Sequence, residues 1–210
     1  MGDIPLALVI ATIWTYWLCV GVMIVRIRRK AHRSVGLVPE QRVEHYMWLI
    51  FVPLVVLWAA LPYLAFTRTS GPLALPDFAR AQPLYVALRW IAAIAGVICL
   101  VATIKCWTRM GKDWSMFVSA KQKTELITDS LFRYIRHPIY AFSVLLMLCT
   151  LVVVPTIPML IVAAVHVVLM NLKARNEERY LLQSHGEAYA RYVAQTGRFF
   201  PRLGGSRPSG

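Results

Sequence analysis

Two groups of polar residues flank the last long apolar tract of the chain, which covers residues 139–171. Arg136-His137-Pro138-Ile139-Tyr140 comes at the start of the tract, and Arg175-Asn176-Glu177-Glu178 follows its end. Arginine and histidine can bind a carboxylate, glutamate can bind an ammonium group, and aromatic rings can stack on a cation. Each residue alone is also ordinary beside a membrane helix. If the tract folds back on itself, the two groups meet and predict a site for a small ligand that carries both a carboxylate and an ammonium group.

The second group belongs to a predicted amphipathic helix. Arg175 and Glu178 stand three residues apart, so a helix places both on one face. That face continues along a helix that lies on the membrane surface or leaves it, through Leu181, His185, Ala188, Tyr189 and Tyr192. The alternative is a solvated face on which Glu177 and Glu178 only form ion pairs with neighbouring basic side chains.

The elements that must position these residues are transmembrane helices. Hydrophobic residues make up 58% of the sequence, and the mean hydropathy is +0.56, which is too apolar for a soluble domain. Residues 4–25, 46–66 and 85–104 form stretches of about 20 residues, the length that crosses a hydrocarbon core of ~30 Å. Arg89 is the one charged residue inside them. The first stretch is too long for a cleaved signal peptide and lacks its usual basic start.

The tract 139–171 is longer than one membrane span needs, and prolines interrupt it at Pro155 and Pro158. Because proline removes a helical hydrogen bond and clashes with the preceding turn, we predict two helices joined by a tight turn. Each arm is short, so the hairpin is shallow or tilted, or its second arm extends past Asn171. The alternative is a single kinked helix over the whole tract.

Basic residues gather on alternate loops. Segments 26–45 and 105–137 and the tail from residue 172 are rich in lysine and arginine, whereas 67–84 holds only two arginines. The positive-inside rule then places the N-terminus outside and both polar groups in the cytoplasm. A net charge of +13 suits an anionic membrane surface, so membrane lipids rather than nucleic acid are the expected partners. We predict an all-α polytopic membrane protein with about five transmembrane helices, the last two a hairpin, followed by a cytoplasmic amphipathic helix.

Motifs for metals and for soluble nucleotide-binding domains are missing from the sequence. It contains no G-x-G-x-x-G, Walker A, H-E-x-x-H or G-x-S-x-G, which excludes a soluble-type nucleotide domain. The cysteines show no C-x-x-C spacing and are interpreted as small packing residues: Cys19, Cys99, Cys106 and Cys149. We expect no metal site and infer no obligate protein partner.

Five ordered motifs in the C-terminal half carry a family resemblance. They are Leu126-Ile127-Thr128-x-x-Leu131-Phe132, Arg136-His137-Pro138-x-Tyr140, Glu177-Glu178-x-x-Leu181, Gly186-x-x-Tyr189-x-x-Tyr192 and Arg198-Phe199-x-Pro201. In this order and spacing they resemble the isoprenylcysteine carboxyl methyltransferase and phospholipid methyltransferase superfamily of integral membrane methyltransferases. The resemblance implies an S-adenosylmethionine site between the R-H-P-x-Y helix start and the E-E helix, capped by the C-terminal segment. It also implies a lipidic acceptor, either an isoprenylcysteine carboxylate or a phospholipid amine.

The resemblance also implies roles for individual residues. His137, Tyr140 and Glu178 would contact the methyl donor, and Arg175 would orient the acceptor, so that Arg175 and Glu178 are the catalytic candidates. The remaining donor-binding candidates are Leu126, Ile127, Thr128, Phe132, Tyr134, Arg136 and Glu177. The hydrophobic part of the acceptor is expected among the segments after Tyr85. Polar residues inside the hairpin are candidates for binding it, namely His166 and Asn171, although His166 could instead bond only to a neighbouring helix.

Four positions depart from the family pattern. Thr124 stands where the family often has His, and Ser130 replaces the usual Gly of the T-x-G turn. Ala141-Phe142 replaces a Gly that often follows the Tyr, and His185-Gly186 replaces an F-G pair. Ser130 and Phe142 bear on any donor contact that needs a backbone free of side chains.

The predicted organisation has three parts: membrane helices over 1–106, a donor-binding catalytic region over 107–202, and a flexible tail over 203–210. The predicted function is methyl transfer from S-adenosylmethionine to a lipidic acceptor. An amine acceptor must lose a proton, for which Glu178 or His137 would be the base. One alternative is an NADPH-dependent reductase of the sterol-reductase type, which shares an R-H-P-N-Y-like element; Ile139 and the glutamate pair argue against it. The other is a non-catalytic membrane scaffold.

Overall fold

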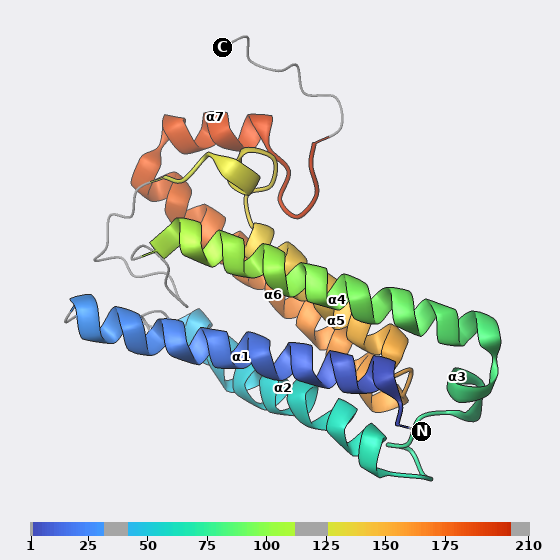
Figure 1. Ribbon diagram of the computed structural model, residues 1–210. Helices are drawn as coiled ribbons and strands as arrows, with labels where there is room; N and C mark the ends of the chain where they lie inside the picture. Colours follow the sequence, from blue (N-terminus) through green and yellow to red (C-terminus); the bar gives the residue numbers. More distant parts are fainter. Residues whose placement is uncertain (1, 32–41, 112–125, 203–210) are drawn as a thin grey trace.

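Helices make up the architecture of the computed structural model, which describes residues 2–31, 42–111 and 126–202 (Figure 1). In chain order they are α1 (Ile4–Ala31), α2 (Arg42–Thr67), α3 (Asp77–Ala81), α4 (Pro83–Met110), the 3₁₀-helix η2 (Ser130–Arg133), α5 (Pro138–Val153), α6 (Ile157–His185) and α7 (Glu187–Gln195). Four of them, α1, α2, α4 and α6, are long and apolar enough to cross a membrane, and α5 is a shorter apolar helix. These ranges contain no named strand, so the predicted all-α polytopic fold is confirmed.

The last apolar tract forms the predicted hairpin of α5 and α6. Between these helices the backbone leaves the helical conformation at Val154, Pro155 and Thr156, so the single kinked helix is wrong. The Thr156 hydroxyl accepts a hydrogen bond from the Met159 N–H at 3.3 Å and caps α6. Pro158 lies in the first turn, where its missing N–H is no loss. The second arm continues past Asn171 to the end of α6, which supplies the length that the sequence required.

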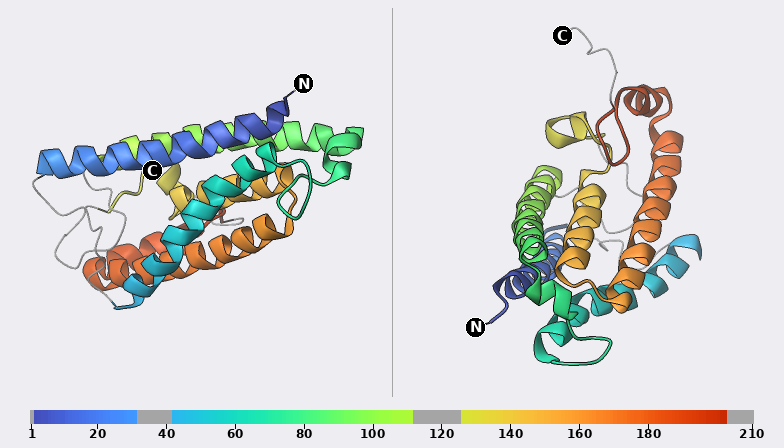
Figure 2. Two further views of the ribbon diagram at one scale, coloured as in Figure 1. Left: turned by 90° about the horizontal axis from the view of Figure 1, so that it is seen from below. Right: turned by 90° about the vertical axis from the view of Figure 1, so that its right-hand side faces the viewer.

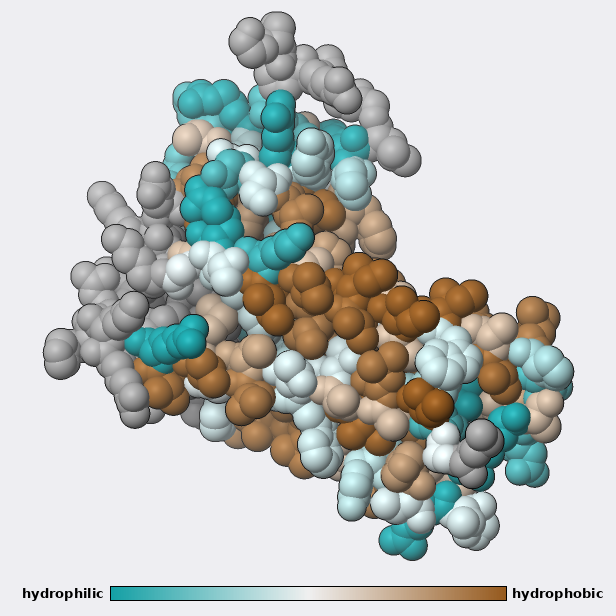
Figure 3. Space-filling view, in the orientation of Figure 1, coloured by the Kyte–Doolittle hydropathy of each residue, from teal (hydrophilic) through white to brown (hydrophobic). Residues whose placement is uncertain are grey.

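The helices pack as a bundle with an apolar outer surface. α5 packs against α4 and α6, α1 packs against α4 and α2, and α2 packs against α6 (Figure 2). Their shared core buries Trp58, Leu146, Met147 and Met159. Figure 3 shows a broad hydrophobic region on one face, with hydrophilic residues gathered toward the ends. Such a surface matches the hydrocarbon region of a bilayer.

Arg89 is buried at the end of the bundle where the α5–α6 turn and α3 lie. Its guanidinium donates to the Val153 carbonyl at 3.0 Å, to the Ala79 carbonyl at 3.1 Å and to the Asp3 carboxylate at 2.7 Å. Only 2% of Arg89 is exposed. The charge inside the third apolar stretch is therefore paired, and it ties α3, α4 and the end of α5 to the start of the chain.

The predicted amphipathic stripe does not run along one helix. α6 ends at His185, and α7 leaves in a new direction after Gly186, whose φ of 52° and ψ of −125° suit glycine. The stripe from Arg175 to Tyr192 is therefore divided between two helices, which corrects the sequence prediction. On α7, Tyr189 and Tyr192 are buried, and the Tyr192 hydroxyl donates to the Phe132 carbonyl at 2.6 Å. This contact holds α7 against η2.

Candidate active site

The C-terminal segment lies beside the R-H-P-x-Y motif and pairs with its backbone. The Arg136 N–H donates to the Gly197 carbonyl at 2.8 Å, and the His137 N–H donates to the Arg198 carbonyl at 3.1 Å. A single parallel bridge joins Ile135 to Gly197. A Cβ atom at Gly197 would overlap the Phe200 carbonyl oxygen, so this tight turn requires glycine. Two motifs that stand far apart in the sequence are thus fixed to each other by backbone hydrogen bonds.

Glu178 joins the arginines of these two motifs. Its carboxylate accepts from Arg136 Nε at 3.0 Å, and from Arg198 Nε at 3.0 Å and Nη2 at 2.5 Å. Arg136 also donates to the carbonyls of Val193 and Thr196, and Arg198 donates to Asn171 Oδ1 at 3.2 Å. The proximity of Glu178 keeps the pKa of Arg198 above its ordinary value. Glu178 therefore fastens the start of α5 and the C-terminal segment to α6.

His137 lies between the two glutamates. Its Nδ1 is 3.5 Å from a Glu177 oxygen, and its Nε2 is 3.5 Å from a Glu178 oxygen. Burial alone would lower the pKa of His137, but the two carboxylates outweigh it and raise the pKa above the ordinary value. The imidazole stacks on the Tyr140 ring with a centroid distance of 5.5 Å. Nε2 is buried and makes no hydrogen bond within the described part of the chain, so the Glu178 carboxylate is its nearest printed partner.

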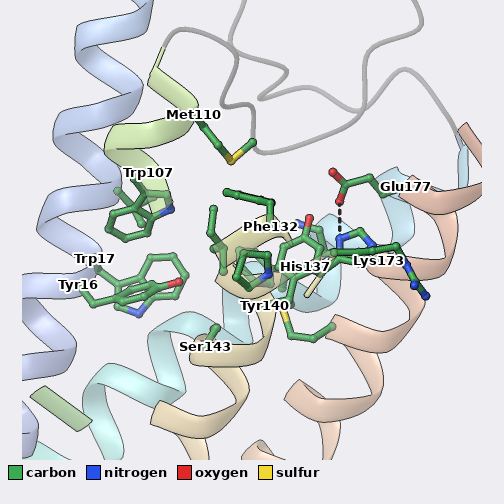
Figure 4. Close-up of a pocket in the computed structure, with 16 residues that line it drawn as sticks. Tyr16, Trp17, Trp107, Met110, Phe132, His137, Tyr140, Ser143, Lys173 and Glu177 are labelled. Carbon is green, nitrogen blue, oxygen red and sulfur yellow. Dashed lines mark ion pairs between the residues drawn. The ribbon is translucent and has the colours of Figure 1, made fainter. Parts of the chain in front are cut away.

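A pocket with a volume of about 100 Å³ opens beside these groups, between α1, α4 and the α5–α6 hairpin. Figure 4 shows Tyr16, Trp17 and Trp107 on one side, and His137, Tyr140, Lys173 and Glu177 on the other. Charged side chains and aromatic rings therefore face one cavity. Its lining consists of Tyr16, Trp17, Val20, Phe51, Trp107, Met110, Phe132, Arg136, His137, Pro138, Ile139, Tyr140, Ser143, Met170, Lys173 and Glu177.

Five of the residues expected from the sequence line this pocket: Phe132, Arg136, His137, Tyr140 and Glu177. Others lie behind or away from it. Glu178 and Asn171 hold Arg198, and His166 is buried behind Ser143. Arg175 is exposed on α6 and does not contribute to the lining. The remaining candidates also lie outside the lining: Leu126, Ile127, Thr128 and Tyr134.

The first two helices contribute more than the sequence suggested. The acceptor was expected among the segments after Tyr85, but Tyr16, Trp17 and Val20 of α1 and Phe51 of α2 line the pocket. These helices reach the pocket because α1 and α2 pack close to the hairpin, while the place of the acceptor stays a prediction. The available signal was the set of tryptophan and tyrosine residues within the apolar stretches. Their convergence depends on helix packing, which no local pattern encodes.

Lys173 is a further lining residue that the sequence analysis did not single out as a site residue. Its ammonium group lies 5.1 Å from the centroid of the Phe51 ring and 5.6 Å from that of Tyr140. These cation–π contacts hold a positive charge at the pocket on the α6 side. The signal in the sequence was its place four residues before Glu177, which puts both side chains on one face of α6.

The departures from the family pattern have different structural outcomes. Ser130 has a φ of 53°, a left-handed conformation that favours glycine, so the backbone keeps the turn that the family pattern implies. Phe142 packs against the core and is not part of the pocket lining. Thr124 lies outside the described residues.

The groups around the pocket suit a zwitterionic ligand that also carries an aromatic ring. Arg136 and Lys173 can bind a carboxylate, Glu177 can bind an ammonium group, and the rings can stack on a flat base or a cation. These charged side chains and aromatic rings fit the carboxylate, ammonium group and flat base of S-adenosylmethionine. Among the described residues, no cluster of His, Cys, Asp or Glu could hold a metal ion.

A comparison with known protein families gives a match for part of the chain. The family model of the isoprenylcysteine carboxyl methyltransferase (ICMT) family matches residues 88–183, which run from α4 through η2 and α5 to the end of α6. A search of the curated proteins found no match. Together with the apolar helices, the family match supports an integral membrane methyltransferase. Over residues 88–183, the chain is similar to the ICMT family.

Proposed function

We propose that the protein transfers a methyl group from S-adenosylmethionine to a lipidic carboxylate that enters the pocket from the bilayer. The observation that carries this proposal is a cavity with an aromatic wall from the membrane helices and a charged wall from the R-H-P-x-Y and E-E motifs. A water-soluble donor and a lipid can meet in such a cavity only where the membrane ends, and the charged wall belongs to the start of α5 and the later part of α6.

The charged wall binds and orients the donor in this proposal. S-adenosylmethionine supplies a methyl group on a positively charged sulfur atom, which needs no further activation by a metal. Glu177 binds the ammonium end of the donor, while Arg136 or Lys173 binds its carboxylate. Phe132 and Tyr140 offer ring faces to the flat base or to the sulfonium charge. Positioning of this kind supplies a large part of the catalysis of a displacement reaction.

Glu178 supports the donor site indirectly. Its ion pairs hold Arg136 in place beside His137 and fix the segment that carries Arg198. The sequence assigned Glu178 to donor contact and catalysis, whereas its carboxylate already accepts hydrogen bonds from both arginines. We therefore assign the direct donor contact to Glu177 and a positioning role to Glu178.

The charge of the pocket favours an anionic acceptor. Arg136, Lys173 and His137 contribute positive charge, and Glu177 is the one carboxylate among the described residues of the lining. A carboxylate is already a nucleophile at neutral pH and needs no base. An amine would have to lose a proton to a base such as neutral His137, whereas the flanking glutamates favour the protonated form of that residue. The aromatic wall excludes water from the reacting groups, which removes the solvation that slows this displacement.

The basic loops suggest an orientation with the pocket on the cytoplasmic side. A membrane-impermeant thiol reagent tests this on single cysteines placed at two exposed positions, Thr69 before α3 and Arg191 on α7. In sealed right-side-out vesicles or cells, we expect labelling at position 69 and none at position 191 until the membrane is opened. The reverse pattern would place the pocket outside.

A transfer assay with radiolabelled methyl groups tests the proposed function. The acceptors are an S-prenylated cysteine carboxylate, phosphatidylethanolamine and a small thiol. We expect label on the prenylated carboxylate as a base-labile methyl ester, and none in the presence of excess S-adenosylhomocysteine. Label on the phospholipid amine instead would replace the proposed acceptor. A folded protein that neither binds donor nor transfers label would contradict the proposal.

A further inference from the structure

Three buried polar residues form a cluster at the membrane-embedded side of the pocket. Ser143 Oγ on α5 lies 3.1 Å from His166 Nε2 on α6, and the Tyr16 hydroxyl on α1 interacts with the Ser143 side chain. The exposed fractions are 5% for both Tyr16 and Ser143 and 1% for His166. Polar groups buried inside an apolar bundle cost free energy unless their hydrogen bonds are completed. The donors and acceptors that lack a partner determine which ligand this cluster can bind.

Only one of the two ring nitrogens of His166 has a hydrogen-bonding partner within the described structure. Nε2 meets Ser143, while Nδ1 is buried without a hydrogen-bonding partner in these ranges. A buried N–H without a partner is more costly and rarer than an unused acceptor. The tautomer with the proton on Nε2 is therefore favoured, and His166 donates to Ser143 Oγ. The Trp58 ring packs on the imidazole at a centroid distance of 5.1 Å and keeps it in place.

Because the Ser143 and Tyr16 hydroxyls interact with each other, one hydroxyl proton of this pair remains for another acceptor. Thr12, Thr103 and Thr150, the other buried hydroxyls within the long helices, each donate to the carbonyl four residues earlier, at 2.8 Å. Ser143 makes no such bond in the described structure; its side-chain partners there are His166 and the Tyr16 hydroxyl. Both Ser143 and Tyr16 line the pocket, and Figure 4 shows Tyr16 reaching from α1 toward Ser143. The cluster thus presents hydroxyl groups to the cavity.

Resting on the proposed function, we infer that Ser143 and Tyr16, with Ser143 oriented by His166, bind an uncharged carbonyl oxygen in the body of the lipidic acceptor. Ser143 lies six residues after His137, which corresponds to about 9 Å along the axis of α5. The charged groups and the hydroxyl groups therefore form two separate poles of one pocket. An uncharged oxygen fits the second pole because no lysine or arginine belongs to the cluster, and an unpaired charge would be costly there.

His166 and Ser143 have separate roles in this inference. Ser143 touches the acceptor, while His166 acts through Ser143 as a positioning residue. His166 does not line the pocket, which refines the sequence expectation that it binds substrate directly. We expect His166→Phe to weaken acceptor binding nearly as much as Ser143→Ala, and the double variant to be no worse than either. His166→Gln, which can still donate to Ser143, should restore part of the affinity.

A matched pair of acceptors tests the inference by binding. One probe is an N-acetylated S-prenyl cysteine, and the other is the same thioether acid without its acetamido group. Affinities are measured by calorimetry on the purified full chain in detergent with S-adenosylhomocysteine present. The wild type should favour the acetylated probe by about 5- to 10-fold, the range expected of one hydrogen bond. Ser143→Ala and Tyr16→Phe should each reduce this ratio toward 1.

The matched control is Thr103→Val, which removes a buried hydroxyl on α4 that does not line the pocket. This variant should keep the wild-type ratio of affinities for the acetylated and unacetylated probes. A wild type that binds both probes equally or neither probe overturns the inference, as does an unchanged ratio in folded Ser143→Ala. Binding of S-adenosylhomocysteine is measured alone first. Its absence would overturn the proposed function. Intact donor binding without a preference for the acetylated probe would overturn only the inference that Ser143 and Tyr16 bind a carbonyl oxygen.

Discussion

Two arginine-centred clusters hold opposite ends of the bundle, and they differ in what lies beside them. Arg89 donates to Asp3, Val153 and Ala79 and lies far from the aromatic pocket. At the other end, Glu178 pairs with two arginines, and next to it His137 keeps a buried Nε2 without a hydrogen bond in the described residues. The first cluster only stabilises the packing of the helices. The second positions Arg136 and His137 in the lining of the pocket, so a buried ion pair marks a site only where it holds groups that face a cavity.

The strongest test of this difference is Glu178→Ala. It leaves Arg136 and Arg198 without their shared carboxylate, and we expect the free energy of unfolding to fall by about 4 kcal/mol. Donor affinity should fall more than 10-fold, because both motifs lose their common anchor. Thermal unfolding in detergent and calorimetry with S-adenosylhomocysteine measure the two effects. Glu187→Ala is the control, since Glu187 is exposed and, among the described residues, pairs only with Arg191 at 3.7 Å. Wild-type stability and affinity in Glu178→Ala would remove the second cluster from the site.

The corresponding change at the other end is Arg89→Leu. It leaves Asp3 and two carbonyls without their donor, so we expect a loss of about 3 kcal/mol in the free energy of unfolding. Donor affinity of the folded fraction should stay unchanged, unlike in Glu178→Ala. Arg68→Leu, at an exposed position of the same end, should leave stability almost unaltered. A loss of donor affinity in folded Arg89→Leu would show that the two ends are coupled.

Gly197→Ala perturbs the second cluster without touching a charge. The new methyl group overlaps the Phe200 carbonyl, so the backbone that pairs with Arg136 and His137 must shift. We expect a loss of about 2 kcal/mol, within the range of overpacked sites, together with weaker donor binding. Gly21→Ala on α1 is the control, because a Cβ there meets nothing within 4 Å. Equal behaviour of the two variants would mean that the turn at Gly197 does not shape the site.

The second cluster should also show a pH dependence that the first lacks. Glu177 and Glu178 raise the pKa of His137 above its ordinary value despite its burial. The stabilisation from the protonated imidazole is therefore complete below about pH 6.5 and is lost as the pH rises through the raised pKa. Unfolding measured across this window should show the fall in the wild type and not in His137→Gln. His185→Gln, outside the pocket, should behave like the wild type; the same slope in His137→Gln would assign the titration to another group.

The hairpin and the meeting of its two polar groups followed from the sequence because both depend on local chemistry. Pro155 and Pro158 cannot continue a helix, and a hairpin necessarily returns Glu177 and Glu178 to the level of His137. The different roles proposed for Glu177 and Glu178 could not be predicted from the sequence. It depends on the rotation of α6 about its axis and on where Arg198 of the C-terminal segment lies. Neither leaves a periodic signal.

The aromatic wall and the second pole were even less accessible to sequence reasoning. Tyr16 and Trp17 belong to a helix that resembles any other apolar span, and only packing brings them to Ser143 and Tyr140. Ser143 gave no signal because serine is common in membrane helices. Its significance comes from the hydrogen bond to His166, and that residue was noticed only as a polar group inside the hairpin. Gly186 was noticed as a motif residue, but the turn it permits divided the predicted stripe.

The most direct measurement of the central claim is donor affinity in a pair of isosteric variants. Calorimetry with S-adenosylhomocysteine compares the wild type, Glu177→Gln at the pocket and Glu187→Gln on the exposed surface of α7. We expect the wild type and Glu187→Gln to bind with the same affinity, and Glu177→Gln to bind at least 10-fold more weakly, since one charged contact is lost. No binding by the folded wild type at millimolar ligand, or equal affinity in all three proteins, would contradict a methyl-donor site at this pocket.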